Sequence, residues 1–324
     1  MEAGLVTHSG VPYTSIPAAG LHGVGLRTLP GNLLRLARGT QAARRILAEF
    51  RPDVLLFTGG YVAAPLAFAG RHIPSLVYCP DVEPGLALKF LGRFAAHIAV
   101  TLDETRAYFP SKKPVTTTGY PLRPDFSGWD RPTARAHFGL SDDLPVLLVT
   151  GGSKGARSLN RALLANLAAL LPLTQVVHIS GQLDWEEVQT AAAGLPSDLA
   201  AGYHPMPYLH EMGAALASAD LVVSRAGASA LGEYPLFGLP ALLVPYPYAW
   251  HYQKVNAAYL VDQGAALMLE DESLADRLLD TLRGLLSDEA RLNGMRLAMQ
   301  SLARPQAASD LAGLVRQLAL GGKQ

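Results

Sequence analysis

The sequence predicts an α/β protein built from two Rossmann-like, doubly wound domains with parallel sheets. Short apolar runs alternate with helix-length amphipathic stretches in both halves of the chain, an alternation typical of βαβ units. The 324 residues are enough for two domains of ~150 residues each. Turn-forming residues concentrate at positions 126–144, so we expect an N-terminal domain at 1–126 and a C-terminal domain at 127–324.

The individual elements follow from the same patterns. In the first half, the amphipathic stretch from Pro30 to Phe50 predicts a helix that ends before Pro52. The apolar runs expected to form strands in this half are 11–16, 54–57, 75–78, 97–101 and 115–118. The strands expected in the second half are 145–150, 175–180, 221–223, 241–244 and 266–269. The helices expected to close the chain are 273–286, 288–303 and 306–319.

Composition excludes several classes of protein. With 49% hydrophobic and 17% charged residues, the chain can bury a large core and is not expected to be disordered. The formal net charge of zero argues against a partner that is a nucleic acid. Cys79 is the single cysteine, so no internal disulfide can form and a reducing compartment is favoured. No apolar run reaches the ~18 residues of a membrane span, so any membrane contact is expected to be peripheral.

One tight turn stands out as a candidate anion site. Small residues, Ala226 to Ser229, join the apolar run 221–223 to a helix that carries Glu233. Such a turn presents free backbone N–H groups and the positive end of the helix dipole, which suit a diphosphate. The Glu233 carboxylate could accept hydrogen bonds from the vicinal hydroxyls of a sugar. The turn taken alone is more typical of an ordinary βα connection followed by an amphipathic helix; the rest of the chain favours the anion site.

A second glycine-rich turn, Gly151 to Arg157, also follows an apolar strand and opens a helix. Glycines such as Gly152 allow the backbone to approach phosphates closely, and Ser153 adds a hydroxyl. The spacing is not that of a Walker A loop. The alternative is that the glycines only permit close packing of helix on strand.

Polar residues at the start of a later helix complete the candidate site. Gln253 can both donate and accept hydrogen bonds, which suits the hydroxyls of a neutral sugar. Asn256 lies three residues further on, on the same helical face. An aromatic loop, Tyr246 to Trp250, precedes them. A solvated first helical turn is the alternative interpretation.

No metal or other cofactor is expected. The sequence contains no Asp-x-Asp motif and no His, Cys or Asp set with zinc-ligand spacing. Helix dipoles together with Arg123 or Arg225 are therefore the expected means of neutralising a diphosphate.

Taken in order, these motifs resemble the MurG family, the peptidoglycan UDP-N-acetylglucosamine transferases, within the GT-B glycosyltransferases. The resemblance is strongest from Pro145 to about Gly264. The stretches that carry it are Gly59 to Val62, Gly119 to Arg123, Gly151 to Asn160, Tyr208 to Met212, Ser224 to Glu233, and Gln253 with Asn256 and Ala257. It implies two domains facing a cleft, with the last helix packing back on the first domain.

The resemblance also implies roles for particular residues. Ser153 would touch the diphosphate, Arg123 would reach it from the hinge, and the backbone of Leu209 would hold uracil. The donor-site residues implied or favoured by these patterns are Arg123, Gly152, Ser153, Leu209, Arg225, Gly227, Ala228, Ser229, Glu233, Gln253 and Asn256. The acceptor side would include Gly59, Gly60 and Tyr61. The family inverts the anomeric carbon without a bound metal and acts on a lipid-linked acceptor at the cytoplasmic face of the bacterial inner membrane.

Three departures from the family pattern bear on catalysis. The family's first strand and its glycine-rich loop ending in histidine have no counterpart, so the first domain is expected to be incomplete at its N-terminus. The family's His-Glu-Gln-Asn acceptor loop reads Tyr78 to Asp81 here, which leaves the general base unknown and Asp81 as a weak candidate. Tyr252 replaces a common histidine beside Gln253, which bears on the identity of the hexose.

Two features leave alternatives open. Helix 30–50 and the segment Lys89 to Phe94 mix basic and large apolar residues, as a patch that docks to an anionic membrane would; an ordinary amphipathic core helix is the alternative. A related transferase with another lipid acceptor, or a catalytically silent protein that binds a UDP-sugar, is the alternative to the lipid I transferase that the family implies.

Overall fold

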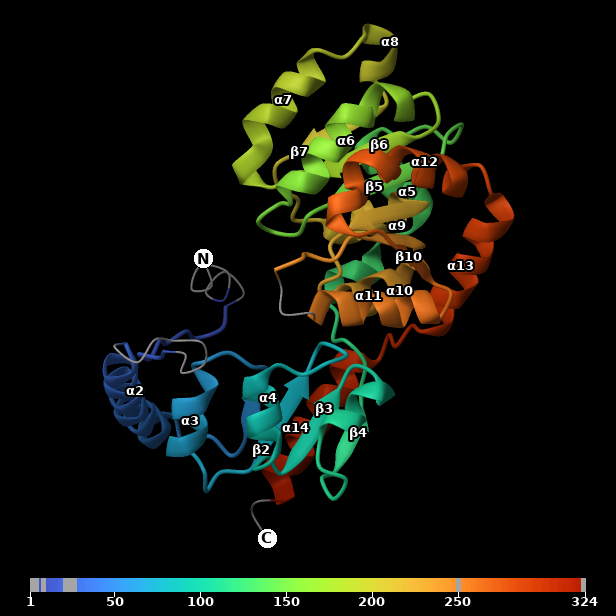
Figure 1. The fold of residues 1–324 in the computed structure, drawn as a ribbon. Helices are drawn as coiled ribbons and strands as arrows, with labels where there is room; N and C mark the ends of the chain where they lie inside the picture. Colours follow the sequence, from blue (N-terminus) through green and yellow to red (C-terminus); the bar gives the residue numbers. More distant parts are fainter. Residues whose placement is uncertain (1–5, 7–9, 20–27, 249–251, 322–324) are drawn as a thin grey trace.

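The structure is a computed structural model that describes residues 6, 10–19, 28–248 and 252–321. It contains two separate sheets with only parallel pairing, one of four strands and one of six (Figure 1). The first sheet has the order β1-β2-β3-β4, formed by β1 (Leu55–Phe57), β2 (Ser75–Cys79), β3 (His97–Val100) and β4 (Val115–Thr117). The predicted α/β class with two parallel sheets is therefore confirmed.

The second sheet has the order β10-β9-β8-β5-β6-β7. Its strands are β5 (Val146–Thr150), β6 (Gln175–Ile179), β7 (Tyr203–Met206), β8 (Leu221–Ser224), β9 (Ala241–Leu243) and β10 (Ala266–Met268). The chain adds β6 and β7 on one side of β5 and then adds β8, β9 and β10 on its other side. Ligands of doubly wound sheets bind at this change of side, beyond the carboxyl ends of the strands.

Helices cover both faces of the second sheet. Alternate residues of each central strand point to opposite faces, so Leu148 and Val222 contribute to one core while Leu147 and Val223 contribute to the other. The first core is completed by α9 (Met212–Ser218), α10 (Ala230–Phe237) and α11 (Tyr252–Asp262). The second is completed by α6 (Arg157–Leu170), α7 (Trp185–Ala193) and α12 (Leu274–Leu286), and α13 (Glu289–Ser301) contributes to both. Two short helices, α5 (Arg131–Phe138) and α8 (Ser197–Ala200), complete this half.

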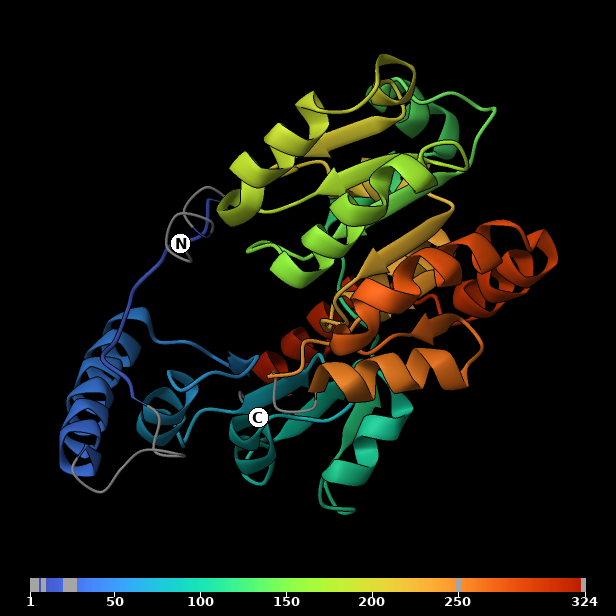
Figure 2. The same ribbon diagram turned by 45° about the horizontal axis from the view of Figure 1, so that its top comes forward.

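The first sheet is also covered on both faces. One face packs against α3 (Ala63–Ala69) and α4 (Leu86–Gly92), with Leu47 of α2 (Leu29–Phe50) at the margin. The other face is covered by α14 (Ala307–Gly321), whose Leu311, Leu314 and Val315 pack on Leu76 and Tyr78 of β2. Figures 1 and 2 both show α14 against the first sheet, although it follows α13 on the second. The chain thus passes between the two halves twice.

The first passage lies close to the second half. A Cβ atom at Gly232 of α10 would come within 2.5 Å of the Tyr120 Cβ atom, so only glycine permits this approach. The chain then enters the second half through a 3₁₀ turn, Pro124–Gly128.

The prediction of a strand at residues 11–16 is wrong, because this segment pairs with no strand among the described residues. Val11 and Tyr13 are largely exposed there. Conversely, the edge strand β7 was not predicted.

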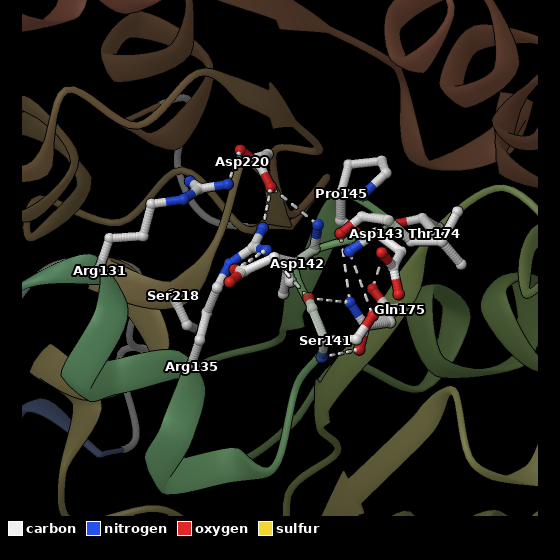
Figure 3. Close-up of polar contacts among 12 residues, drawn as sticks. Arg131, Arg135, Ser141, Asp142, Asp143, Pro145, Thr174, Gln175, Ser218 and Asp220 are labelled. Atoms are coloured by element: carbon white, nitrogen blue, oxygen red, sulfur yellow. Dashed lines mark hydrogen bonds and ion pairs between the residues drawn. The ribbon is translucent and has the colours of Figure 1, made fainter.

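A buried cluster of charges braces the amino-terminal edge of the second sheet (Figure 3). The Asp220 carboxylate accepts hydrogen bonds from Arg135 Nη2 and from the Val146 backbone N–H, both at 2.9 Å. Its second oxygen lies 2.6 Å from Arg131 Nη2. This network joins α5 to the starts of β5 and β8, at the edge opposite the carboxyl ends of these strands.

Candidate functional site

The carboxyl ends of β5, β6 and β8 open into one cavity of about 530 Å³. Both predicted anion turns line it, and Arg123 reaches it from the passage between the halves. Predicted site residues that line it are Arg123, Gly152, Ser153, Leu209, Arg225, Gly227, Ser229, Glu233 and Gln253. Ser153 and Glu233, 80 positions apart in the sequence, therefore share one crevice; we call it the donor cavity.

The two turns present backbone donors without protein partners. Among the described residues, the backbone N–H groups of Gly227, Ala228 and Ser229, before α10, bond to no protein acceptor. The same holds for the N–H groups of Ser153 and Lys154 in the turn before α6. Two groups of free N–H donors near helix N-termini make the donor cavity suitable for a diphosphate.

Close backbone packing fixes the shape of the turn after β5. Gly155 has φ of +77°, and a Cβ atom there would lie 2.2 Å from the Ser180 carbonyl oxygen. The turn after β5 therefore rests directly on the turn after β6. Ser153 is held at the cavity wall by this contact and not by its own side chain.

Glu233 lies in the first turn of α10. Burial raises its pKa, an effect opposed by a hydrogen bond with Ser229 and by the nearby charge of Arg123. A half-buried carboxylate in this position can accept hydrogen bonds from two adjacent hydroxyls.

Arg225 lines the cavity, but its guanidinium is already engaged. Its Nη2 donates to Ser158 Oγ at 2.8 Å, its Nη1 donates to the Val244 carbonyl at 3.1 Å, and Nη1 also pairs with Asp271 at 2.5 Å. The predicted contact of Arg225 with a diphosphate stays a prediction. Arg123 is more exposed, at 57% of its side chain, but it also has partners: its Nη2 lies 3.4 Å from Asp125 Oδ2 and donates to the His210 carbonyl at 3.3 Å. Its guanidinium stacks 4.8 Å from the Phe126 ring centroid.

Gln253 links the donor cavity to the aromatic loop. Its Oε1 accepts a hydrogen bond from the Tyr246 N–H at 2.8 Å, which leaves its amide nitrogen free to donate to a ligand. Ala249 to His251 of this loop lie outside the described residues.

Asn256 does not line the donor cavity; it joins the two halves of the molecule. It is fully buried, and its Oδ1 accepts from the Val82 N–H at 3.0 Å. Its Nδ2 donates to Asp81 Oδ1 at 2.9 Å and to the Ala226 carbonyl at 3.2 Å. We call this set of contacts the Asn256 bridge. It connects the loop after β2 to the turn that holds the free N–H groups of Gly227 to Ser229.

The end of β2 and the loop that follows it are where the sequence departs from the family pattern. The Tyr78 hydroxyl is turned inward, 2.8 Å from Thr101 Oγ1, and Cys79 is buried. Burial raises the pKa of Asp81, and the Asn256 hydrogen bond opposes this effect. The predicted role of Asp81 as a base stays untested by this geometry.

The residues predicted for the acceptor side lie on the first half, in the turn between β1 and α3. Gly59 and Gly60 have φ of +114° and +82°, and the Tyr61 side chain is 62% exposed. Ala228, predicted for the donor side, is half-buried in the turn before α10 and does not line the donor cavity.

Sequence patterns missed several residues of the cavity wall. Phe126, Ile179 and Met212 line it, although apolar residues in such places are usual core positions. Tyr208 lines it too, packed edge to face on His210 with ring centroids 4.9 Å apart. Ile179 is the last residue of β6, a position that could have indicated a role. Tyr208 and Met212 belong to a stretch that carries the family resemblance, and Phe126 lies in a 3₁₀ turn without such a signal.

No group of three or more His, Cys, Asp or Glu side chains among the described residues could hold a metal ion. None of the described helices has the length and apolar character needed to cross a membrane.

Comparisons with known proteins agree with the site. The N-terminal domain of glycosyltransferase family 28 matches residues 1–100, and the C-terminal domain of that family matches residues 146–311. The UDP-N-acetylglucosamine–N-acetylmuramyl-(pentapeptide) pyrophosphoryl-undecaprenol N-acetylglucosamine transferase of Roseiflexus sp. (strain RS-1) is 41% identical over 361 residues, covering 99% of this chain and 82% of that protein. The transferase of the same name from Chlorobaculum parvum is 40% identical, covering 97% of this chain and 87% of that protein.

Solved structures agree with the sequence comparisons. MurG of Acinetobacter baumannii superposes with a TM-score of 0.77 at 28% identity, covering 98% of this chain and 88% of that one. A UDP-GlcNAc 2-epimerase from Neisseria meningitidis has a TM-score of 0.68 at 12% identity, covering 98% and 88%, and so shares the fold alone. The fold, the family models and relatives at 40% and 41% identity agree, and the chain belongs to glycosyltransferase family 28 and, within it, to the MurG family of GT-B transferases.

Proposed function

We propose that this chain transfers N-acetylglucosamine from UDP-N-acetylglucosamine to N-acetylmuramyl-(pentapeptide) pyrophosphoryl-undecaprenol, as its curated relatives are named to do. The observation that carries the proposal is the donor cavity, in which Ser153, Glu233 and Gln253 line one crevice with Arg123. Each supplies a group suited to one part of a UDP-sugar.

In the proposed donor complex, the diphosphate lies against the free N–H groups before α6 and α10. The ribose hydroxyls donate to Glu233, whose position in the first turn of α10 places it one turn from those N–H groups. The uracil lies at Leu209, against the apolar wall that includes Phe126 and Met212. The transferred sugar lies at Gln253, between this cavity and the first half.

In the proposed reaction, the acceptor hydroxyl attacks the anomeric carbon as the bond to the diphosphate breaks, which inverts the configuration. The free N–H groups and Arg123 stabilise the charge that develops on the leaving diphosphate, a role that needs no metal ion. Asp81 is the candidate base. Because burial raises its pKa, it would hold a transferred proton better than an exposed carboxylate.

The proposed acceptor carries a lipid, so the protein needs contact with a membrane surface. We propose a peripheral contact at the cytoplasmic face through the first half. Exposed aromatic side chains gather there: Phe90 packs edge to face on Phe94 at 5.2 Å, and the Arg71 guanidinium lies 5.8 Å from the Phe68 ring centroid. Basic and aromatic side chains together suit an anionic lipid surface.

Calorimetric titration with UDP and UDP-N-acetylglucosamine tests the donor site directly. We expect both to bind, and Glu233→Ala to weaken UDP binding at least tenfold, with Glu272→Ala as an exposed control. Transfer of labelled sugar to the lipid-linked acceptor, and not to diacylglycerol, should persist in excess EDTA. Absence of UDP binding would reject the proposal.

A further inference from the structure

A second cavity of about 700 Å³ adjoins the donor cavity on the far side of the turn after β5. Gly151, Lys154, Arg225 and Gln253 line both cavities, so the two meet at the end where the transferred sugar is proposed to lie. The second cavity is otherwise walled by the start of α6, by Leu183 and by Tyr246 to Tyr248 after β9. The donor has no part left to occupy it once the nucleotide and the sugar lie in the first cavity.

The charge of the second cavity is unbalanced. Three cationic and two anionic side chains line it, a formal excess of one positive charge. Arg157 is paired with Asp184, its Nε donating to Oδ1 at 2.8 Å, and Arg225 is paired with Asp271. Lys154 forms no ion pair with any residue in the part of the chain that the structure describes, and it is exposed. An anionic group in this cavity would therefore meet an available cation.

The wall of the cavity also includes exposed apolar side chains. Tyr248 is 81% exposed and Leu183 is 75% exposed. Tyr246 packs edge to face on Tyr248 with ring centroids 5.5 Å apart, and the Arg225 guanidinium lies 5.4 Å from the Tyr246 centroid. The Arg225 guanidinium thus contacts Tyr246 of the aromatic pair, while Tyr248 remains exposed. Tyrosines held in this way bind peptide backbone and small side chains at low cost in conformational entropy.

We propose that this cavity, which we call the peptide subsite, holds the peptide of the acceptor, recognised as a short peptide that carries a free carboxylate. The inference rests on the proposed function. The acceptor hydroxyl has to approach the sugar near Gln253, so the peptide attached to the muramyl ring falls within reach of the adjoining cavity. The carboxylate pairs with Lys154, and the peptide lies between Leu183 and Tyr248.

Equilibrium binding to the full chain saturated with UDP tests the subsite. The probes are soluble N-acetylmuramyl-pentapeptide, the same compound with its carboxylates converted to amides, and N-acetylmuramyl amide without a peptide. We expect the first probe to bind at least fivefold more tightly than either of the others. Tyr248→Ala and Lys154→Gln should each weaken the first probe three- to tenfold and leave the peptide-free probe unchanged. Lys112→Gln, an exposed lysine on the first half, is the matched control and should change nothing.

Equal affinity for the peptide-bearing and peptide-free probes would overturn the peptide subsite, as would variants that weaken both equally or no detectable binding of the first probe. UDP binding is measured first with the same protein. If UDP binds and the probes behave in one of these ways, the peptide subsite fails while the proposed function stands. If UDP does not bind, the proposed function fails and the subsite with it.

Discussion

Removal of the Asn256 bridge should loosen the contact between the two halves of the molecule. Asn256→Ala deletes three hydrogen bonds: one from Val82 N–H, one to Ala226 O and one to the Asp81 carboxylate. A neutral hydrogen bond contributes about 1 kcal/mol and one to a charged group ~1.5–3 kcal/mol. Part of the loss is regained when the separated groups are hydrated, so we expect the open arrangement to gain ~2–4 kcal/mol relative to the closed one.

The Val82 backbone N–H reports this change directly, because its partner belongs to the other half. Hydrogen exchange of a short peptide that spans Val82, measured by mass spectrometry, should accelerate by roughly 30- to 1000-fold, since 1.4 kcal/mol is a factor of ten. Asn166→Ala is the matched control, because that amide bonds only within α6, to Ala162 O at 2.9 Å. UDP affinity should change less than threefold while the turnover number falls.

Asn256→Asp makes the test sharper. The substitution keeps the acceptor for Val82 N–H but places a second carboxylate against Asp81, where the two charges repel. The protection factor of the Val82 N–H should therefore be lower than in Asn256→Ala at pH 7 and should rise on acidification, when the pair shares a proton. Unchanged Val82 exchange in both variants would refute the idea that the bridge holds the halves together.

Three further predictions concern single carboxylates. Burial raises the pKa of Glu233, so the affinity for UDP-N-acetylglucosamine, measured by calorimetry, should begin to fall on acidification above the ordinary glutamate pKa near 4.3. The Glu233→Gln variant should bind more weakly at every pH, with an affinity independent of pH. If the affinity of the variant falls with pH in parallel with the wild type, Glu233 is not the titrating group. Asp220→Asn removes the carboxylate that Arg131 and the buried Arg135 share, and leaves Arg135 only the exposed Asp142. Urea denaturation should therefore show a loss of ~3–5 kcal/mol, against less than ~0.5 kcal/mol for the exposed control Asp198→Asn; similar values for the two variants would contradict this role. The folded protein holds the Asp81 proton to higher pH than the unfolded chain does, so the stability that Asp81 contributes is complete below about pH 4 and is lost as the pH rises through its raised pKa. Asp81→Asn should accordingly be more stable than the wild type at pH 7 but not at pH 4, and if Asp81 is the base, turnover should fall at least ~100-fold with unchanged UDP affinity; a loss below tenfold would leave it only in the bridge.

The order of strands and helices could be predicted from the sequence because both sheets are buried on two faces. Their strands are short continuous apolar runs that helical stretches separate, which is the strongest local signal available. The edge strand β7 (Tyr203–Met206) escaped because it contains Pro205 and is only half-buried beyond Tyr203, and proline is tolerated at sheet edges while weakening the strand pattern.

The parts of the candidate site that belong to local motifs could be predicted from the sequence. Side-chain contacts with residues distant in the sequence could not. The two glycine-containing turns were identified from spacing alone, and they share the donor cavity. Arg225 lines the cavity, but its own motif could not indicate that Asp271, 46 positions away, engages its guanidinium. Asn256 was grouped with Gln253 by helical spacing, yet its partners Asp81 and Val82 lie on the other half. Contacts between the two halves do not change the spacing of apolar residues in either half, so they could not be predicted from it.

The double passage of the chain constrains how the molecule can move. A Cβ atom at Gly119, on the first passage, would lie 2.7 Å from the Arg304 Cβ atom on the second, so the two connections run side by side. Two adjacent connections act as one hinge, so the halves can move relative to each other mainly by rotation about it. The displacement is largest for the parts of the halves that lie farthest from this hinge. Contacts between the halves such as the Asn256 bridge would then have to break as the molecule opens.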